Sequence, residues 1–284
     1  MPAIRPMRPE DAEAAFELAV RCFDDLSERF GLPHDPPHDP AIAHIRHRHL
    51  ARTDPDGCFV AEEDGGLVGV GLSIRREGLW GLSLLVVDPR LQSTGLGSEL
   101  LRRTAAYGAG ARGRIILSSQ DARALRAYRR LGLWPQPCLK AVGTPRGVAE
   151  PASVRPGTRA DIPLTEAVDR AVRGAAHGAD IGCLLDMRVE LLVVPDRGYA
   201  VTRENGGGLR LLAATDEEAA RDLLRAALAR AEGEMGIEWL SERQGWALDV
   251  CLDAGLDLRV DGGAVFADGE IGPFRPYLPS GAFL

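Results

Sequence analysis

The feature that most constrains this chain is an internal repeat. Residues 4–11 (IRPMRPED) return as residues 154–161 (VRPGTRAD), 150 positions later. Three further blocks recur at a constant spacing of 123 positions, and they are 99–102 with 222–225, 116–118 with 239–241, and 131–133 with 254–256. Blocks repeated in a fixed order indicate a tandem duplication. The drop in spacing predicts that the second copy lacks about 27 residues from its middle.

The length of the chain agrees with two domains. A single hydrophobic core seldom grows beyond roughly 250 residues. This chain has 284 residues. Residues 143–153 are rich in Gly, Pro and Ala, which is typical of a linker. We therefore predict a first domain over residues 1–143, a linker over 144–153 and a second, shortened domain over 154–284.

The pattern of apolar residues predicts a mixed α/β fold with an antiparallel beginning. In the first copy a short strand precedes a helix over about 12–24, and a polar loop leads to a second helix over about 40–52. The expected later elements are strands at 58–63, 68–75, 80–87 and 114–118, a helix ending near 108, a helix over 121–131 and a last strand. The sequence DGG at 64–66 indicates a hairpin turn.

Composition excludes several classes of protein. The amino terminus lacks the apolar segment of a signal peptide, and the most apolar stretch, 82–87, is far shorter than a membrane span. The five cysteines are scattered and form no Cys-x-x-Cys pair, which favours reduced, mostly buried thiols. We expect a cytoplasmic monomer or homodimer without membrane or nucleic-acid partners. Basic and acidic residues nearly balance over 1–150, whereas acidic residues dominate 151–284 and produce the net charge of −7.

The loop QSTGLG at 92–97 has the character of an anion site. It follows an apolar strand and precedes a helix, so free backbone amides and the helix dipole favour a phosphate there. Gly95 and Gly97 allow the backbone to approach such a group closely. A Walker loop would need a lysine after Gly97, and a dinucleotide fingerprint would need a third glycine at Leu100. The loop therefore belongs to neither class.

The segment 87–101 resembles the acyl-CoA loop of the GNAT superfamily of N-acetyltransferases, Gln/Arg-x-x-Gly-x-Gly/Ala. The segment DARALRAYRRLGL at 121–133 resembles the second signature of that superfamily, Asn-x-x-Ala-x-x-x-Tyr-x-x-x-Gly-Phe. Asp121 stands here for the usual Asn and Leu133 for the usual Phe. The resemblance covers about residues 3–143, and it reaches the rest of the chain only through the repeat.

The resemblance implies that acetyl-CoA is the co-substrate and that Tyr128 is the general acid for the departing thiolate. Val86 and Val87 are expected to pair with pantetheine, and Asp121 is expected near the same arm. The loop and the first turn of its helix are expected to hold the pyrophosphate through Gln92, Ser93, Thr94, Gly95, Leu96, Gly97 and Ser98. Arg129 and Arg130 are candidates for the 3′-phosphate end.

The sequence gives fewer indications of the residues that bind the amine acceptor. Phe30, His34 and Trp80 are candidates for the acceptor pocket, with core packing as the alternative for the two aromatic residues. No general base stands out among Glu77, Ser83 and Ser119, and the apolar tail 277–284 is a further candidate through its terminal carboxylate. Five histidines crowd into residues 34–49, but their spacing and Pro punctuation do not favour a metal site. His44 and His47 are expected to face solvent.

The second copy is predicted to be degenerate. At the 123-residue spacing, Gly95 aligns with Glu218 and Tyr128 with Cys251, and the sequence DEE at 216–218 would repel pyrophosphate. We therefore expect one acetyl-CoA site per chain and acetyl transfer to a primary amine of a small molecule. The alternatives are a non-catalytic acyl-CoA-binding or regulatory module, and a protein N-acetyltransferase.

Overall fold

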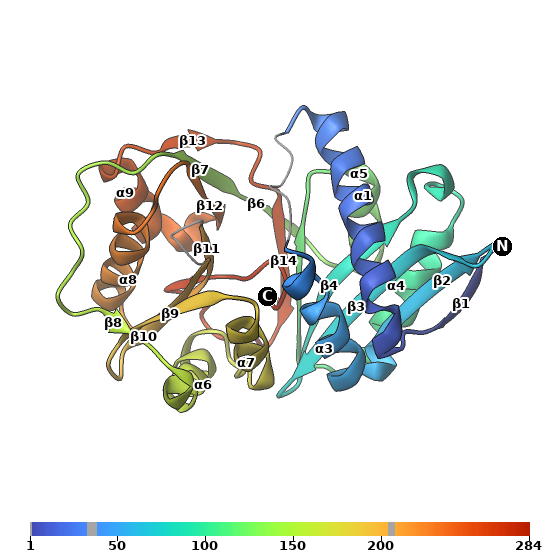
Figure 1. Ribbon diagram of the computed structural model, residues 1–284, viewed down its shortest axis with the longest axis horizontal. Helices are drawn as coiled ribbons and strands as arrows, with labels where there is room; N and C mark the ends of the chain where they lie inside the picture. Colours follow the sequence, from blue (N-terminus) through green and yellow to red (C-terminus); the bar gives the residue numbers. More distant parts are fainter. Residues whose placement is uncertain (1, 33–38, 204–207) are drawn as a thin grey trace. The chain divides into compact units, whose positions relative to one another are not determined.

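The computed structural model describes residues 2–32, 39–203 and 208–284 (Figure 1). Its contacts divide the chain into two compact units, of which the first comprises Met1–Arg75 with Trp80–Ala111 and the second Arg76–Leu79 with Arg112–Leu284. Mixed α/β folding is confirmed, with strands and helices in both units. Within the described ranges, no helix has the length and apolar character that crossing a membrane requires.

The first unit is an antiparallel sheet covered by helices. Its strands follow one another in the order β1, β2, β3 and β4, as the predicted antiparallel beginning requires. The elements are β1 (Ala3–Pro6), α1 (Ala12–Phe30), α2 (Pro40–Ala43), α3 (Ile45–Thr53), β2 (Cys58–Glu63), β3 (Gly66–Arg76), β4 (Leu79–Val87) and α4 (Leu96–Tyr107). The hairpin turn between β2 and β3 has positive φ at Asp64 and Gly65, as the sequence predicts.

Small residues on β3 bring helix α4 close to the sheet. A Cβ at Gly69 would lie 2.8 Å from Leu100 Cδ1, and a Cβ at Gly71 would lie 2.9 Å from Thr104 Cγ2. Leu96 and Leu100 of α4 join a buried cluster with Ala61, Val68 and Val87 from the strands. The packing of this cluster therefore fixes the start of α4 relative to the end of β4.

The second unit contains the rest of the first copy and the whole of the second. Its elements are β5 (Gly113–Ser118), α5 (Ala122–Arg130), β6 (Pro135–Pro137), β7 (Leu139–Gly143), β8 (Arg155–Pro156), α6 (Ile162–Val172), α7 (Ala179–Asp186), β9 (Val189–Val194), β10 (Gly198–Arg203), β11 (Leu209–Ala214), α8 (Glu217–Ala229), β12 (Met235–Leu240), α9 (Gly245–Asp253), β13 (Asp257–Arg259), β14 (Ala264–Gly269) and β15 (Tyr277–Leu278).

Nearly the same order of elements occurs twice, from β1 to β7 and from β8 to β14, with α7 alone in the place of α2 and α3. The repeated Arg and Asp of the opening motif also have the same role in each copy. Asp11 accepts from Arg5 and from the backbone N–H of Arg8, and Asp161 accepts from Arg155 and from the backbone N–H of Thr158. Two elements are shorter in the second copy, since α6 has 11 residues where α1 has 19, and β10 has 6 where β3 has 11, whereas α8 has 13 where α4 has 12.

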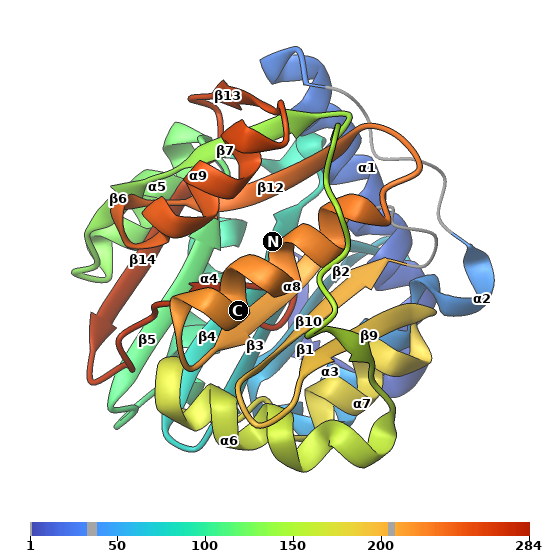
Figure 2. The same cartoon turned by 90° about the vertical axis from the view of Figure 1, so that its left-hand side faces the viewer.

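The two copies exchange their last strands. Strand β14, from the second copy, lies between β5 and β6, and it pairs antiparallel with β5 from Ala264 opposite Ser118 to Gly269 opposite Gly113. Strand β7, from the first copy, lies between β12 and β13 (Figure 2). Strand pairing therefore crosses the predicted linker in both directions, which explains why contacts join residues 112–284 into one unit.

Candidate active site

The loop between β4 and α4 is held by its own side chains. The Gln92 side-chain amide donates to the Val87 carbonyl over 3.1 Å, and the Thr94 hydroxyl donates to the Leu91 carbonyl over 2.7 Å. Asp88 accepts from the backbone N–H of Arg90 and forms an ion pair with its guanidinium. Ser93 has a positive φ of 65 degrees. A non-glycine residue adopts this left-handed conformation at some energetic cost.

The loop opens into the amino terminus of α4 without a side-chain cap. Gly95 is the N-cap with a φ of 98°, and its lack of a side chain leaves the first amides of the helix without an acceptor from this position. A Cβ at Gly97 would meet only Val87 Cγ2 at 3.5 Å, so packing does not require a glycine there. Uncapped amides, the helix dipole and the bare backbone at Gly97 together suit a phosphate group.

Val86 and Val87 end strand β4, and both side chains are buried. The Val87 carbonyl accepts from Gln92 Nε2 and also from Cys22 Sγ on α1, over 3.4 Å. Sequence reasoning assigned Gln92 to phosphate binding through its backbone and did not identify these two side-chain contacts. Gln92 thus ties the loop to the strand end at which pantetheine is expected.

Asp121 and Tyr128 belong to the second unit, at the N-cap and in the last turn of α5. Asp121 caps this helix by accepting from the backbone N–H of Arg123 over 2.8 Å, and it forms an ion pair with the Arg123 guanidinium. A short carboxylate fits this N-cap as well as the family's asparagine does. The Tyr128 side chain is 5% exposed, and its ring contacts Phe266 edge to face. Burial, and next the charge of Asp121, raise the pKa of the Tyr128 phenol, so it remains protonated at neutral pH.

Of the candidate acceptor residues, Trp80 is a core residue. Its side chain is 1% exposed, its indole N–H donates to the Thr104 carbonyl, and it packs on Gly108. These contacts favour packing over the predicted role as a pocket wall. Phe30 ends α1, is 42% exposed and contacts the Arg29 guanidinium. His34 lies outside the described residues.

The candidate bases already have partners or are buried. Glu77 forms an ion pair with Arg170 and accepts from the backbone N–H of Ala176, and Arg170 lowers the pKa of Glu77. Ser119 Oγ accepts from the backbone N–H of Asp121 over 3.3 Å, and Ser83 is buried in β4. The surroundings of Glu77 therefore make it a weaker base.

The expectation that His47 faces solvent is wrong. The predicted single helix over 40–52 breaks at His44 into α2 and α3, and this break turns His47 toward α1. His47 is 2% exposed and contacts the Phe16 ring edge to face at 5.8 Å. Its burial lowers its pKa well below the usual value. Among the described residues, no group of His, Cys, Asp and Glu has a metal-binding arrangement.

The second copy differs at the position that corresponds to the loop. Residues 88–95 separate β4 from α4, whereas only Thr215 and Asp216 separate β11 from α8. The constant spacing of 123 residues had aligned Gly95 with Glu218. The helix starts align Gly95 with Asp216 instead, since these two residues are the N-caps of α4 and α8. The Asp216 carboxylate accepts from the backbone N–H of Ala219 over 3.0 Å and pairs with Arg197. A carboxylate of the chain therefore takes the place that a phosphate takes at an uncapped helix.

The tail of the chain binds along the edge of β11. Strand β15 pairs with β11 through Tyr277 opposite Ala213, and the backbone N–H of Ala214 donates to the Pro276 carbonyl. Ala214 ends β11 as Val87 ends β4, so the tail lies where the repeat would place pantetheine. The Leu284 carbonyl accepts from Tyr277 and from Arg173, over 2.7 and 2.9 Å. The tail is thus bound by residues of the second copy.

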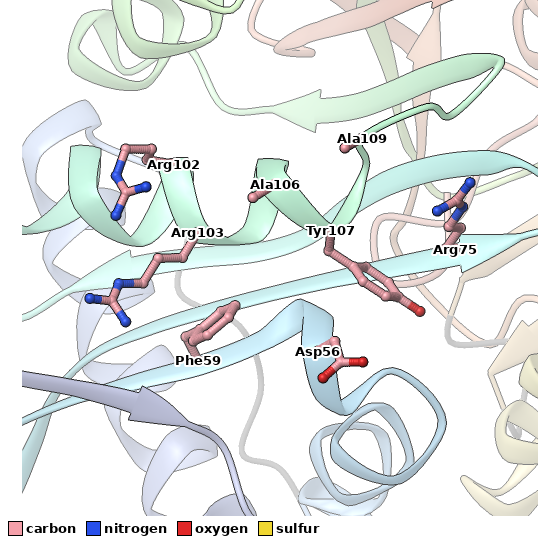
Figure 3. A pocket seen from close by; sticks show the side chains of 8 residues that line it. All are labelled: Asp56, Phe59, Arg75, Arg102, Arg103, Ala106, Tyr107 and Ala109. Atoms are coloured by element: carbon pink, nitrogen blue, oxygen red, sulfur yellow. The ribbon is translucent and has the colours of Figure 1, made fainter.

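A surface pocket of about 620 Å³ lies beside the second half of α4 (Figure 3). None of the predicted site residues lines it, and the residues that do are Asp56, Phe59, Arg75, Arg102, Arg103, Ala106, Tyr107 and Ala109. Arg102 and Arg103 both form ion pairs with Glu99, which offsets much of their charge. This pocket therefore shares no lining residue with the candidate active site.

Residues 15–133 match the model of the GNAT acetyltransferase family. A search of curated proteins found no match. Among solved structures, a putative acetyltransferase from Pyrococcus horikoshii is similar over 99% of this chain and 95% of its own, with 16% identity and a TM-score of 0.78. A GCN5-related N-acetyltransferase from Sphaerobacter thermophilus is similar over 99% of this chain and 98% of its own, with 17% identity and a TM-score of 0.56.

A tandem GNAT protein from the clavulanic acid biosynthesis pathway is similar over 95% of this chain and 98% of its own, with 12% identity and a TM-score of 0.57. These similarities extend the GNAT fold over both copies of the repeat. Acyl-CoA-dependent acetyl transfer is the general activity of the matched family. The chain thus carries, over residues 15–133, a domain of the GNAT acetyltransferase family.

Proposed function

We propose that this protein transfers the acetyl group of acetyl-CoA to a primary amine of a small molecule, at one site per chain. The observation that carries the proposal is the loop 92–97, which leads into a helix without a side-chain cap. Backbone amides there offer several donors to the pyrophosphate, with the helix dipole behind them. The strand end at Val86 and Val87 offers backbone groups to the pantetheine arm.

The proposed reaction is a direct transfer in which one side chain, Tyr128, gives up a proton. The amine nitrogen attacks the thioester carbonyl carbon, a C–N bond forms and the C–S bond breaks. Tyr128 donates its phenolic proton to the departing sulfur, which leaves as the CoA thiol. The proton that the amine nitrogen loses as the amide forms passes to the Tyr128 phenolate, so the enzyme regains its starting state. The Tyr128 phenol carries its proton across the neutral range, since its pKa lies above the ordinary value.

Replacing Tyr128 by Phe tests the acid role. Release of CoA thiol is measured with a panel of small amines, and acetyl-CoA affinity is measured by calorimetry. We expect kcat to fall about a hundredfold, since positioned acids contribute that much or more, while acetyl-CoA affinity stays unchanged. Because Tyr128 packs mainly through its ring, the variant keeps its fold.

The same assay separates the alternatives. Tight binding of acetyl-CoA without turnover on any amine would favour a non-catalytic acyl-CoA-binding module. Turnover on peptides with a free amino terminus or lysine, but on no small amine, would favour a protein N-acetyltransferase. Unchanged kcat in Tyr128→Phe would remove the acid role from Tyr128.

A further inference from the structure

The second copy supplies the strand beneath helix α5. Strand β14 fills the space between β5 and β6, with Phe266 opposite Ile116 on one side and Pro135 on the other. Figure 2 shows this strand in red beside the green strands of the first copy. The first copy's own last strand, β7, pairs with β12 and β13 instead. A residue from the second copy therefore occupies the sheet position that faces Tyr128.

Phe266 contacts Tyr128 directly. The two ring centroids lie 5.4 Å apart with an interplanar angle of 77°. This is the edge-to-face geometry that aromatic rings favour. Phe266 is 0% exposed and Tyr128 is 5% exposed. A fully buried ring in a strand paired on both edges has little freedom to move, so it restricts the rotation that would displace the Tyr128 hydroxyl.

We propose that Phe266 is a positioning residue for Tyr128, so that the second copy completes the catalytic site of the first. This inference rests on the proposed function, because it assumes that the Tyr128 hydroxyl takes part in acetyl transfer. The hydroxyl lies at the far end of the ring, where a small rotation moves it most. Misplacement of a reacting group by about 1 Å can lower a rate about a hundredfold.

The test replaces Phe266 by Leu in the full chain, which removes the ring and keeps an apolar side chain. We expect kcat to fall about tenfold, with the KM for acetyl-CoA unchanged. The matched control is Val265→Ala, because Val265 is the neighbour of Phe266 on the same buried strand and alternation points it to the other face of the sheet. The control is expected to keep the kcat of the natural chain. An equal loss of kcat in Val265→Ala would overturn the proposal, since the effect would then belong to the strand as a whole.

A double variant decides whether Phe266 acts through Tyr128. In the Tyr128→Phe background, Phe266→Leu is expected to change kcat by less than about twofold, because the group that it positions is already absent. A full additional loss would overturn the inference and indicate a general packing role. If Phe266→Leu does not fold, Phe266→Met takes its place with the same expectations.

The outcomes separate this inference from the proposed function. Unchanged kcat in Tyr128→Phe alone contradicts the acid role. A lowered kcat in Tyr128→Phe together with full activity in Phe266→Leu contradicts only the positioning role.

Discussion

At the scale of single residues, Gly97 distinguishes a requirement of the ligand from a requirement of the fold. Its added Cβ would make only one ordinary contact. Alanine stabilises a helix by up to about 1 kcal/mol relative to glycine, so we expect Gly97→Ala to unfold at the same or a higher temperature. We also expect its affinity for acetyl-CoA to fall at least about tenfold, because the methyl group lies where the pyrophosphate approaches. Calorimetric titration and thermal unfolding measure the two effects.

Gly245→Ala is the matched control for this prediction. Gly245 is the first residue of α9, and an added Cβ there meets no atom within 4 Å. The control is expected to gain a similar small stability and to keep its acetyl-CoA affinity. Full affinity in Gly97→Ala would contradict the placement of the pyrophosphate at this helix.

Single residues also show what the sequence could reveal about the site. Gly95 and Gly97, together with the second signature that ends at Gly132, made this loop a candidate phosphate site in the sequence. The hydrogen bond from the Gln92 side chain to the Val87 carbonyl could not be predicted. A glutamine at this position looks the same in the sequence whether its backbone amide binds a phosphate or its side chain binds the strand end. His47 was misplaced for another reason, since a break at His44 rotates the following turn of helix and no helix-breaking residue marks it.

At the scale of elements, a buried network joins α6, β10 and the tail. Asp169 accepts from His177 Nδ1 over 2.8 Å and from the Tyr199 hydroxyl over 2.5 Å, and all three side chains are fully buried. Burial alone would raise the pKa of Asp169, but the charge of His177 and these hydrogen bonds outweigh it and lower the pKa. The network thus depends on an ionised carboxylate.

Asp169→Asn tests this dependence. A depressed pKa adds stability that is fully present above the carboxyl pKa of the unfolded chain and is lost as pH falls through the lower pKa of the folded chain. We expect the variant to lose about 3 kcal/mol of unfolding free energy at neutral pH. The difference from the natural chain is expected to shrink below about pH 4, as measured by urea unfolding. A difference that stays constant down to acid pH would contradict an ionised Asp169.

The elements themselves were largely predictable, whereas the partners of the last strands were not. Turn residues and runs of apolar residues located β2, β3 and β4 to within a few residues, because a strand that is buried over most of its length reads as an apolar run between turns. The exchange of β7 and β14 leaves no such record, since two copies of one fold offer nearly equivalent edges to either strand. The choice is made by long-range packing, of which the contact of Phe266 with Tyr128 is one part.

At the scale of the whole molecule, duplication has left two helix starts with opposite chemistry. The start of α4 has no side-chain cap, whereas the start of α8 is capped by Asp216. The edge of β11 is also paired with the chain's own tail at Ala213 and Ala214. Pyrophosphate would meet negative charge at α8, and a pantetheine arm would have to displace β15.

These differences predict that the chain binds one equivalent of acetyl-CoA. Isothermal titration is expected to give one equivalent for the natural chain and none for Gly97→Asp, which places a carboxylate in the loop and repels the pyrophosphate. Asp216→Ala is expected to lose about 1 kcal/mol of stability with its cap, yet to bind still only one equivalent, because the tail continues to cover β11. A second equivalent in the natural chain, or one retained in Gly97→Asp, would show that the second copy binds acetyl-CoA. A second equivalent only in Asp216→Ala would show instead that charge, and not the tail, keeps this copy closed.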